Sequence, residues 1–319
     1  MRPFEYRRVA TPAEAIDLAA GHWDAMYLAG GTELVNWLKQ GIVAPALIID
    51  LSPCALAGIG IDGDTLSIGG LASMAAVAEN PEVRRRVPAL AAAIEQAASP
   101  AIRRMGTIAG NLLQRTRCPY FRSAGPCNRR DLGSGCSAGG GDQRGSAILG
   151  ASPGCVATHP SDLAVVLTLL EAELVVQGEA GRRSLAVESL YPAMADPAVE
   201  HTLIRGELIT DLRVPLGRAA TETRFVKIRD RASFDFTLVA AAGHLIVEDG
   251  VIADARLAFG GVAARPWRAR TAEAQLIGRP PIPDTVVRAV AAELAGAMIL
   301  PGARFKPELM VRAATKALL

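Results

Sequence analysis

Near its N-terminal end the chain reads Leu28-Ala29-Gly30-Gly31-Thr32-Glu33-Leu34-Val35, a short apolar strand followed by a glycine turn and a helix. A similar pattern returns in Gly106-Thr107-Ile108-Ala109-Gly110-Asn111. Glycines let the backbone approach a phosphate closely, and successive N–H groups form a nest for an anion. One glycine pair after a strand is more often only a tight turn. Two such loops in one α/β region predict a dinucleotide whose pyrophosphate is held from both sides, while the absence of G-x-G-x-x-G argues against a Rossmann site.

Composition narrows the class of protein. Half of the 319 residues are hydrophobic and 21% are charged, which is enough apolar material for two or three packed domains. The net charge is only +2, with scattered basic residues, so nucleic acid is not expected as the main partner. Apolar runs such as 163–170 are far shorter than the roughly 20 residues of a membrane span. The first residues contain no apolar signal-peptide core, so the chain by itself is predicted to be cytoplasmic.

The first part of the chain has two different patterns. Residues 1–115 alternate between short strands and helices, and the first helix opens at the capping box Thr11-Pro12-Ala13-Glu14. Residues 116–155 are rich in glycine, serine, arginine and proline and have no sustained periodicity. A loop of this length in a compact domain usually indicates function or disorder, and we treat it as an insertion.

Regular structure resumes at Ser161-Asp162, which is predicted to cap an apolar helix. A later strand ends at Pro215-Leu216-Gly217-Arg218, a pattern typical of a domain boundary. Beyond it, strands joined by the hairpin turn Glu248-Asp249-Gly250 and followed by three helices indicate a separate α+β unit. We therefore predict a first domain over 1–218 and a second over 219–319.

The irregular stretch holds Cys118, Cys127, Cys136 and Cys155, whereas Cys54 stands alone. A chain without a secretory signal is an uncommon place for two structural disulfides, which favours a metal. The C-x8-C-x8-C-x18-C spacing lacks the C-x2-C knuckle usual in structural zinc sites, although four thiolates suit either iron–sulfur or zinc. Five arginines against two aspartates give a local charge of +3, which suits an anionic cluster. Zinc, and four simply free cysteines, stay open as alternatives.

Taken together, the motifs resemble the FAD-binding medium subunits of the xanthine dehydrogenase and carbon monoxide dehydrogenase family of molybdenum hydroxylases. The two glycine loops resemble that family's paired FAD-binding loops. His159-Pro160-Ser161-Asp162 resembles its flavin-contacting Ser-Asp element, and Gly206-Glu207-Leu208-Ile209 resembles the strand entry after it. Lys227-Ile228-Arg229 resembles the basic element that opens its C-terminal domain. These matches follow the family's order and cover nearly the whole chain.

The resemblance implies an α+β fold. A two-subdomain FAD-binding domain of the vanillyl-alcohol-oxidase-like (PCMH) type would be followed by a domain like the C-terminal domain of the CO dehydrogenase flavoprotein. FAD would be contacted by both glycine loops and by three later residues. The implied set is Leu28, Ala29, Gly30, Gly31, Thr32, Glu33, Leu34, Val35, Thr107, Ile108, Ala109, Gly110, Asn111, Asp162, Ile209 and Lys227.

The cysteine stretch resembles the medium subunits of bacterial periplasmic aldehyde oxidoreductases, which carry a [4Fe–4S] cluster beside FAD. That resemblance implies that Cys118, Cys127, Cys136 and Cys155 ligate one such cluster. Benzoyl-CoA-type reductases also have a cluster insertion, with a different cysteine spacing, and most xanthine dehydrogenases have none.

The implied role is electron transfer in a molybdenum-dependent aldehyde oxidoreductase. Electrons would pass from a molybdopterin-binding large subunit through a [2Fe–2S] small subunit to FAD on this chain, and then to an external acceptor. The chain has no G-x-S-x-G, H-E-x-x-H or paired-carboxylate motif, so we predict no catalytic residue in it. As in the resembled complexes, export to the periplasm would depend on a partner with a twin-arginine signal.

Three alternatives stay open. The first is the same role in a complex of the xanthine dehydrogenase or hydroxybenzoyl-CoA reductase type. The second is a stand-alone flavin oxidoreductase, which would need a general acid or base beside the flavin. The third is a cluster-holding assembly protein or redox sensor that has lost flavin binding.

Overall fold

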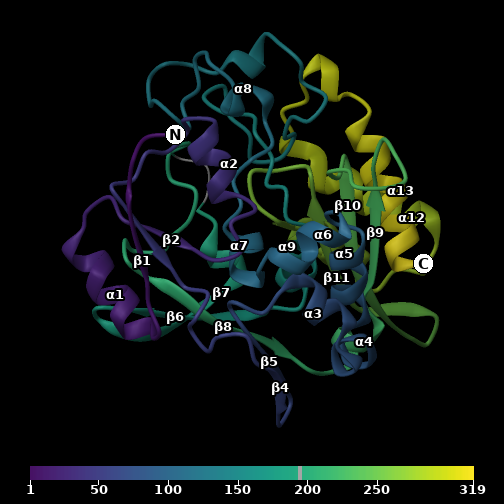
Figure 1. The fold of residues 1–319 in the computed structure, drawn as a ribbon. Coiled ribbons are helices and arrows are strands. Elements are labelled where there is room, and N and C mark those ends of the chain that lie inside the picture. Colours follow the sequence, from purple (N-terminus) through teal and green to yellow (C-terminus); the bar gives the residue numbers. More distant parts are fainter. Residues whose placement is uncertain (193–195) are drawn as a thin grey trace.

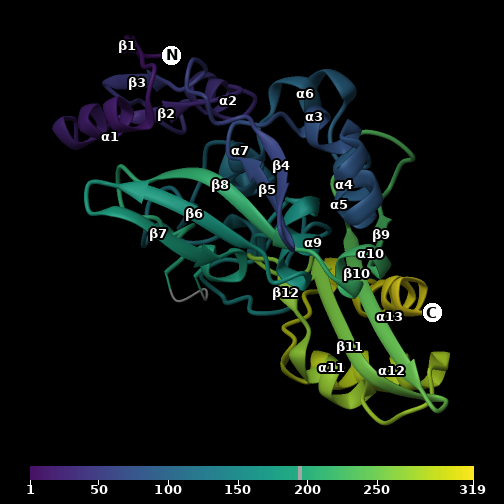
Figure 2. The same cartoon turned by 90° about the horizontal axis from the view of Figure 1, so that it is seen from below.

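The structure is a computed structural model that describes residues 1–192 and 196–319. Within these ranges the strands form a three-stranded, a five-stranded and a four-stranded sheet. Figure 2 shows the N-terminal unit above one end of the five-stranded sheet, with the C-terminal sheet and its helices on the opposite side of the molecule. The mixture of helices and sheets confirms the predicted α+β fold.

The N-terminal unit is a small parallel sheet of order β1-β3-β2 with two helices. Helix α1 begins as predicted, because the Thr11 hydroxyl accepts from the Glu14 amide at 3.2 Å and Pro12 occupies the first turn. The buried side chains of β3 hold the sheet against both helices. The elements are β1 (Glu5–Arg8), α1 (Pro12–Gly21), β2 (Met26–Leu28), α2 (Leu34–Lys39) and β3 (Leu47–Asp50).

The second unit is an antiparallel sheet of order β4-β5-β8-β6-β7 packed against helices. Helix α9 lies at its centre and every one of its residues is buried, with the Ser161 hydroxyl capping its first turn as predicted. The strands are β4 (Ile59–Asp62), β5 (Thr65–Gly69), β6 (Glu173–Gly178), β7 (Gly181–Ala186) and β8 (Leu208–Pro215). The helices are α3 (Met74–Glu79), α4 (Pro81–Arg86), α5 (Pro88–Glu95), α6 (Pro100–Met105), α7 (Ile108–Leu112), α9 (Asp162–Leu169), η2 (Val187–Leu190) and α10 (Arg218–Glu222).

The cysteine-containing insertion is largely irregular, as its sequence indicates. Its regular elements are the single turns α8 (Pro119–Arg122) and η1 (Ser137–Gly139). Figure 1 shows this segment around α8 at the top of the molecule, beside α2 and the loops that precede α13.

The C-terminal unit is an antiparallel sheet of order β12-β11-β10-β9, with helices α11, α12 and α13 on one face. Alternate residues of β10 face two different cores: Ala241 faces these helices and Ala242 faces the core around α9. The strands are β9 (Arg224–Ile228), β10 (Val239–Glu248), β11 (Val251–Gly260) and β12 (Trp267–Arg268). The helices are α11 (Arg270–Leu276), α12 (Pro283–Glu293), η3 (Leu294–Gly296), η4 (Pro301–Ala303) and α13 (Lys306–Leu318).

The hairpin between β10 and β11 forms where the sequence predicts it. Asp249 and Gly250 have φ angles of 49° and 78°, a left-handed pair that glycine and aspartate tolerate in tight hairpins. The second of the three predicted helices, α12, ends at Glu293 and continues as the 3-10 turn η3.

Candidate cofactor-binding site

The two glycine loops lie against each other. A Cβ added at Gly30 would come within 1.7 Å of the Met105 carbonyl oxygen, and one added at Gly106 within 3.6 Å of the Thr32 hydroxyl. Gly31 has a φ of +72°, which an L side chain rarely adopts. The first loop therefore needs glycine both for its turn and for the close approach of the second loop.

A cleft of about 310 Å³ opens between these loops and the chain segment that enters β8. Such a volume is in the range of small-molecule sites. Ten of the sixteen residues predicted to contact FAD line it: Ala29, Gly30, Gly31, Thr32, Glu33, Leu34, Thr107, Ala109, Gly110 and Ile209. The sequence thus predicted the two loops that meet at this cleft, although they lie far apart in the chain.

The third wall of the cleft is the segment from Leu203 to Leu208. Its second half belongs to the element Gly206–Ile209 that carries part of the family resemblance, but none of its residues is in the predicted FAD-contact set. Tyr27 closes the wall, because its hydroxyl donates to the Gly206 carbonyl at 2.7 Å, and burial raises the pKa of Tyr27 to about 12. Glu207 also lines the cleft, and its hydrogen bonds with Arg183 lower its pKa. Tyr27 in the middle of β2 gave no signal for this contact.

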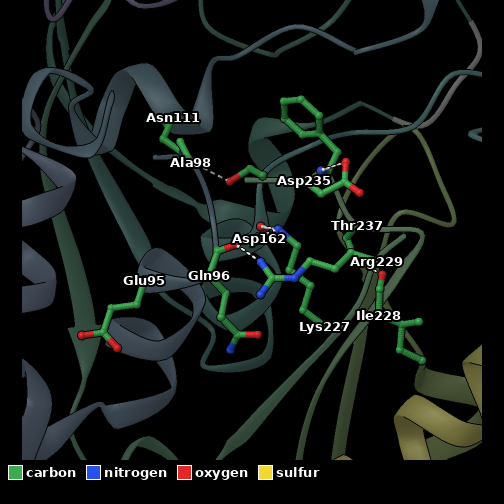
Figure 3. Close-up of polar contacts among 12 residues, drawn as sticks. Glu95, Gln96, Ala98, Asn111, Asp162, Lys227, Ile228, Arg229, Asp235 and Thr237 are labelled. Carbon is green, nitrogen blue, oxygen red and sulfur yellow. Dashed lines mark hydrogen bonds and ion pairs between the residues drawn. The ribbon is translucent and has the colours of Figure 1, made fainter. Parts of the chain in front are cut away.

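Six predicted residues do not line the cleft: Leu28, Val35, Ile108, Asn111, Asp162 and Lys227. The Asn111 side chain instead accepts a hydrogen bond of 2.6 Å from the Ser161 hydroxyl. Lys227 binds the Asp162 carboxylate at 2.7 Å, as Figure 3 shows, and both side chains are almost fully buried. The second Asp162 oxygen is buried without a hydrogen-bond partner. Burial raises the pKa of Asp162, and the Lys227 ammonium opposes that shift.

The four cysteines of the insertion line one common cavity, and none forms a disulfide. Cys127 and Cys136 face each other in a short antiparallel bridge, which joins two of the four segments. Burial raises the pKa of the Cys118 thiol. In the described ranges, no three or more His, Cys, Asp or Glu side chains gather closely enough to hold a single metal ion.

Two glutamates outside the insertion attach it to the rest of the molecule. Glu33, on the first glycine loop, forms ion pairs with Arg117 and Arg122. Glu200 forms ion pairs with Arg115 and Arg129. These side chains are all at most one-quarter exposed, and buried pairs of this kind fix geometry more than they add stability. Glu33 lines the cleft, and its carboxylate is engaged by arginines of the insertion.

Comparison with known proteins identifies the family. The model of the FAD binding domain in molybdopterin dehydrogenase matches residues 2–217, and that of the CO dehydrogenase flavoprotein C-terminal domain matches residues 224–316. The chain belongs to this family. It is an oxidoreductase subunit with the FAD-binding domain of the molybdenum hydroxylases, as its motifs predicted. No helix in the described residues is both long and apolar enough to cross a membrane.

Individual relatives agree with this assignment. The chain is 42% identical over 280 residues to the aldehyde oxidoreductase FAD-binding subunit PaoB of Escherichia coli K12, covering 86% of each chain. It is 27% identical to the glyceraldehyde dehydrogenase medium chain of Sulfolobus acidocaldarius, covering 91% of this chain and 86% of that one. The solved quinoline 2-oxidoreductase of Pseudomonas putida 86 superposes with a TM-score of 0.76 at 22% identity, covering 99% and 95% of the two chains, which shows the shared fold.

Proposed function

We propose that FAD binds in the cleft between the two glycine loops, with its pyrophosphate flanked by residues 28–35 and 107–111. The observation that supports this most is that two sequence-distant glycine loops lie against each other and together line one cleft. Asp162 and Lys227 form a buried pair that joins α9 to β9, next to the Ser161–Asn111 contact between α9 and α7, so we assign them to holding α9 beside the ribityl or ring end of FAD. The division into domains at 218/219 is part of the same proposal.

Within the complex, the role of this chain is to relay electrons rather than to transform substrate. When bound, FAD supplies a centre that can accept and release electrons, while the protein orients it and excludes water. Both carboxylates that line the cleft, Glu33 and Glu207, are committed to arginine ion pairs. A stand-alone flavin oxidoreductase would need a free acid or base there; the ion pairs remove both carboxylates from that role, which favours the relay and leaves His201 as the imidazole in the lining.

We further propose that Cys118, Cys127, Cys136 and Cys155 hold a [4Fe–4S] cluster. Four thiolates are the ligand complement of such a cluster. The four cysteines line one common cavity, which supports a shared metal centre. The insertion also contributes few large buried side chains of its own, so a metal would help to hold it together.

The implied partners are a molybdopterin-binding large subunit, a [2Fe–2S] small subunit and an external electron acceptor. Aldehydes are the proposed substrate class, because the 42% identical relative is named for aldehyde oxidation and the 27% identical one for glyceraldehyde oxidation. A complex of the xanthine dehydrogenase or hydroxybenzoyl-CoA reductase type is the second candidate. Turnover of aldehydes but not xanthine by the purified complex would separate the two.

The cluster assignment is tested by cofactor analysis of the chain purified with its partner subunits. We expect FAD, and more iron and acid-labile sulfide than [2Fe–2S] clusters alone provide, by four of each per complex. Cys136→Ser should lose that extra iron and keep FAD. Cys54→Ser is the matched control, because Cys54 is buried against the N-terminal sheet and away from the cavity. One zinc without extra sulfide, or full iron in Cys136→Ser, would contradict the assignment.

A further inference from the structure

Arg129 directs its guanidinium at one of the four cysteines. Its Nε donates to the Cys155 sulfur at 3.3 Å, and its Nη1 donates to a Glu200 carboxylate oxygen at 2.9 Å. The side chain is only 8% exposed. Arg129 lies two residues after Cys127, whereas Cys155 ends the insertion, so this contact joins two cysteine segments.

The orientation of Arg129 is fixed from its far side. Glu200 is clamped between Arg129 and Arg115, and the Arg115 guanidinium lies 4.4 Å from the centre of the Phe121 ring. Phe121 is fully buried and lines the cysteine cavity. A planar guanidinium held by a carboxylate loses little freedom when it makes one further hydrogen bond. The N–H that points at Cys155 is therefore preorganised.

Arg129 also lies on the side of the cysteine cavity that faces the flavin cleft. A small cavity of about 20 Å³ has Arg129, Glu200 and His201 in its lining. It shares Arg129 with the cysteine cavity, and it shares His201 and Leu113 with the cleft. The polar contacts of Arg129 thus lie between the proposed cluster site and the proposed FAD site.

The other arginines of the insertion are directed elsewhere. Arg117 and Arg122 bind Glu33, Arg144 binds Asp230, and exposed Arg130 donates to the Gly125 carbonyl. In the described part of the chain, Arg129 is the one arginine with a hydrogen bond to a cysteine sulfur.

We propose that Arg129 is a positioning residue that raises the reduction potential of the cluster through its N–H bond to the Cys155 sulfur. This inference rests on the cluster proposed above. Reduction adds one electron and one negative charge, and no proton or covalent bond changes at the arginine. A cationic donor at a ligand sulfur stabilises the more negative, reduced form, and hydrogen bonds to sulfur are known to tune such potentials. Arg129 would thereby set the driving force between cluster and flavin.

The test compares Arg129→Gln, Arg129→Lys and the control Arg130→Gln in the chain purified with its partner subunits. FAD, iron and sulfide contents are measured first, and the cluster potential is then measured by EPR-monitored redox titration. At a fixed potential we expect the oxidised-to-reduced ratio of the cluster to rise about tenfold in Arg129→Gln, a shift of about −59 mV for one electron. Arg129→Lys keeps the charge and should fall in between, and Arg130→Gln should match the unmodified protein.

Two results would overturn the inference. One is a fully loaded Arg129→Gln protein whose cluster potential is unchanged. The other is loss of the cluster from both Arg129 variants with FAD retained, which would make the residue a structural anchor instead. Absence of the extra iron and sulfide from the unmodified protein is a different outcome, because it would remove the proposed cluster itself.

Discussion

Replacing Lys227 by Met should destabilise the protein strongly, because it removes one partner of a buried ion pair. The Lys227 ammonium lies 2.7 Å from the Asp162 carboxylate and also donates to the Gln96 carbonyl at 3.0 Å (Figure 3). The side chains of Lys227 and Asp162 are 1% and 3% exposed. Neither group can recover water when the other is lost.

The cost follows from the burial. Removing one partner of such a pair costs about 3–5 kcal/mol, since the remaining charge is stranded in a poorly polarisable environment. Asp162 would respond by taking up a proton, as burial already raises its pKa. A carboxyl whose pKa is raised in the folded state binds more protons folded than unfolded, so stability falls as pH rises above the unfolded value. The loss of unfolding free energy caused by Lys227→Met should therefore be smaller at pH 5 than at pH 7.

Urea unfolding, followed by tryptophan fluorescence and flavin release, measures this deficit. Asp162→Asn in the Lys227→Met background should recover at least about 1 kcal/mol, because it removes the stranded charge. Lys39→Met is the control: Lys39 is exposed, and surface changes usually stay within about 0.5 kcal/mol. Strictly additive effects of the two substitutions, or a deficit that grows toward pH 5, would refute the reasoning.

Two further changes probe other contacts. Gly30→Ala should lose FAD and lower the free energy of unfolding by about 1–3 kcal/mol, because its Cβ would overlap the Met105 carbonyl. Gly21→Ala is the control, because a Cβ there meets open space, and it should retain FAD. Flavin absorbance per chain distinguishes the two outcomes. Lys306 is buried with its ammonium donating to the Ser146 and Gly261 carbonyls, and burial lowers its pKa to about 7. Above pH 7 the unfolded chain then binds more protons than the folded protein. Between pH 7 and 9, the free energy of unfolding of the unmodified protein should therefore rise relative to that of Lys306→Met by up to about 1.4 kcal/mol per pH unit. Urea unfolding of the two proteins with the same pH dependence would contradict this.

Local signals were enough for the helix starts, the hairpin and both glycine loops. Each is encoded within a few residues: the Thr11 hydroxyl reaches an amide three residues on, and Gly250 permits a left-handed turn. The strand β1 was not predicted, since all four of its residues are exposed and it has no apolar alternation. Residues 5–8 form a strand because they pair in parallel with β3. A partner about 40 residues away cannot be predicted from these four residues alone.

The only walls of the cleft that the sequence predicted are segments that contain a characteristic glycine motif. Asp162 and Lys227 were selected as flavin neighbours, and the structure pairs them with each other across 65 positions of sequence. The contact of Tyr27 with Gly206 spans 179 positions. Contacts of this kind depend on how the units pack together, and no spacing rule encodes them.

The charge of the insertion shows why composition alone is not sufficient. Its five arginines and two aspartates leave +3, which the sequence suggested as the attraction for an anionic cluster. In the structure, Arg117 and Arg122 pair with Glu33, Arg129 with Glu200, and Arg144 with Asp230. Counting these three outside carboxylates, together with Arg115, which shares Glu200, reduces +3 to +1. Most of the positive charge of the insertion is therefore paired, and stabilisation of an anionic cluster would have to come mainly from directed donors. The N–H that Arg129 holds against Cys155 is such a donor, and Glu200 fixes its direction.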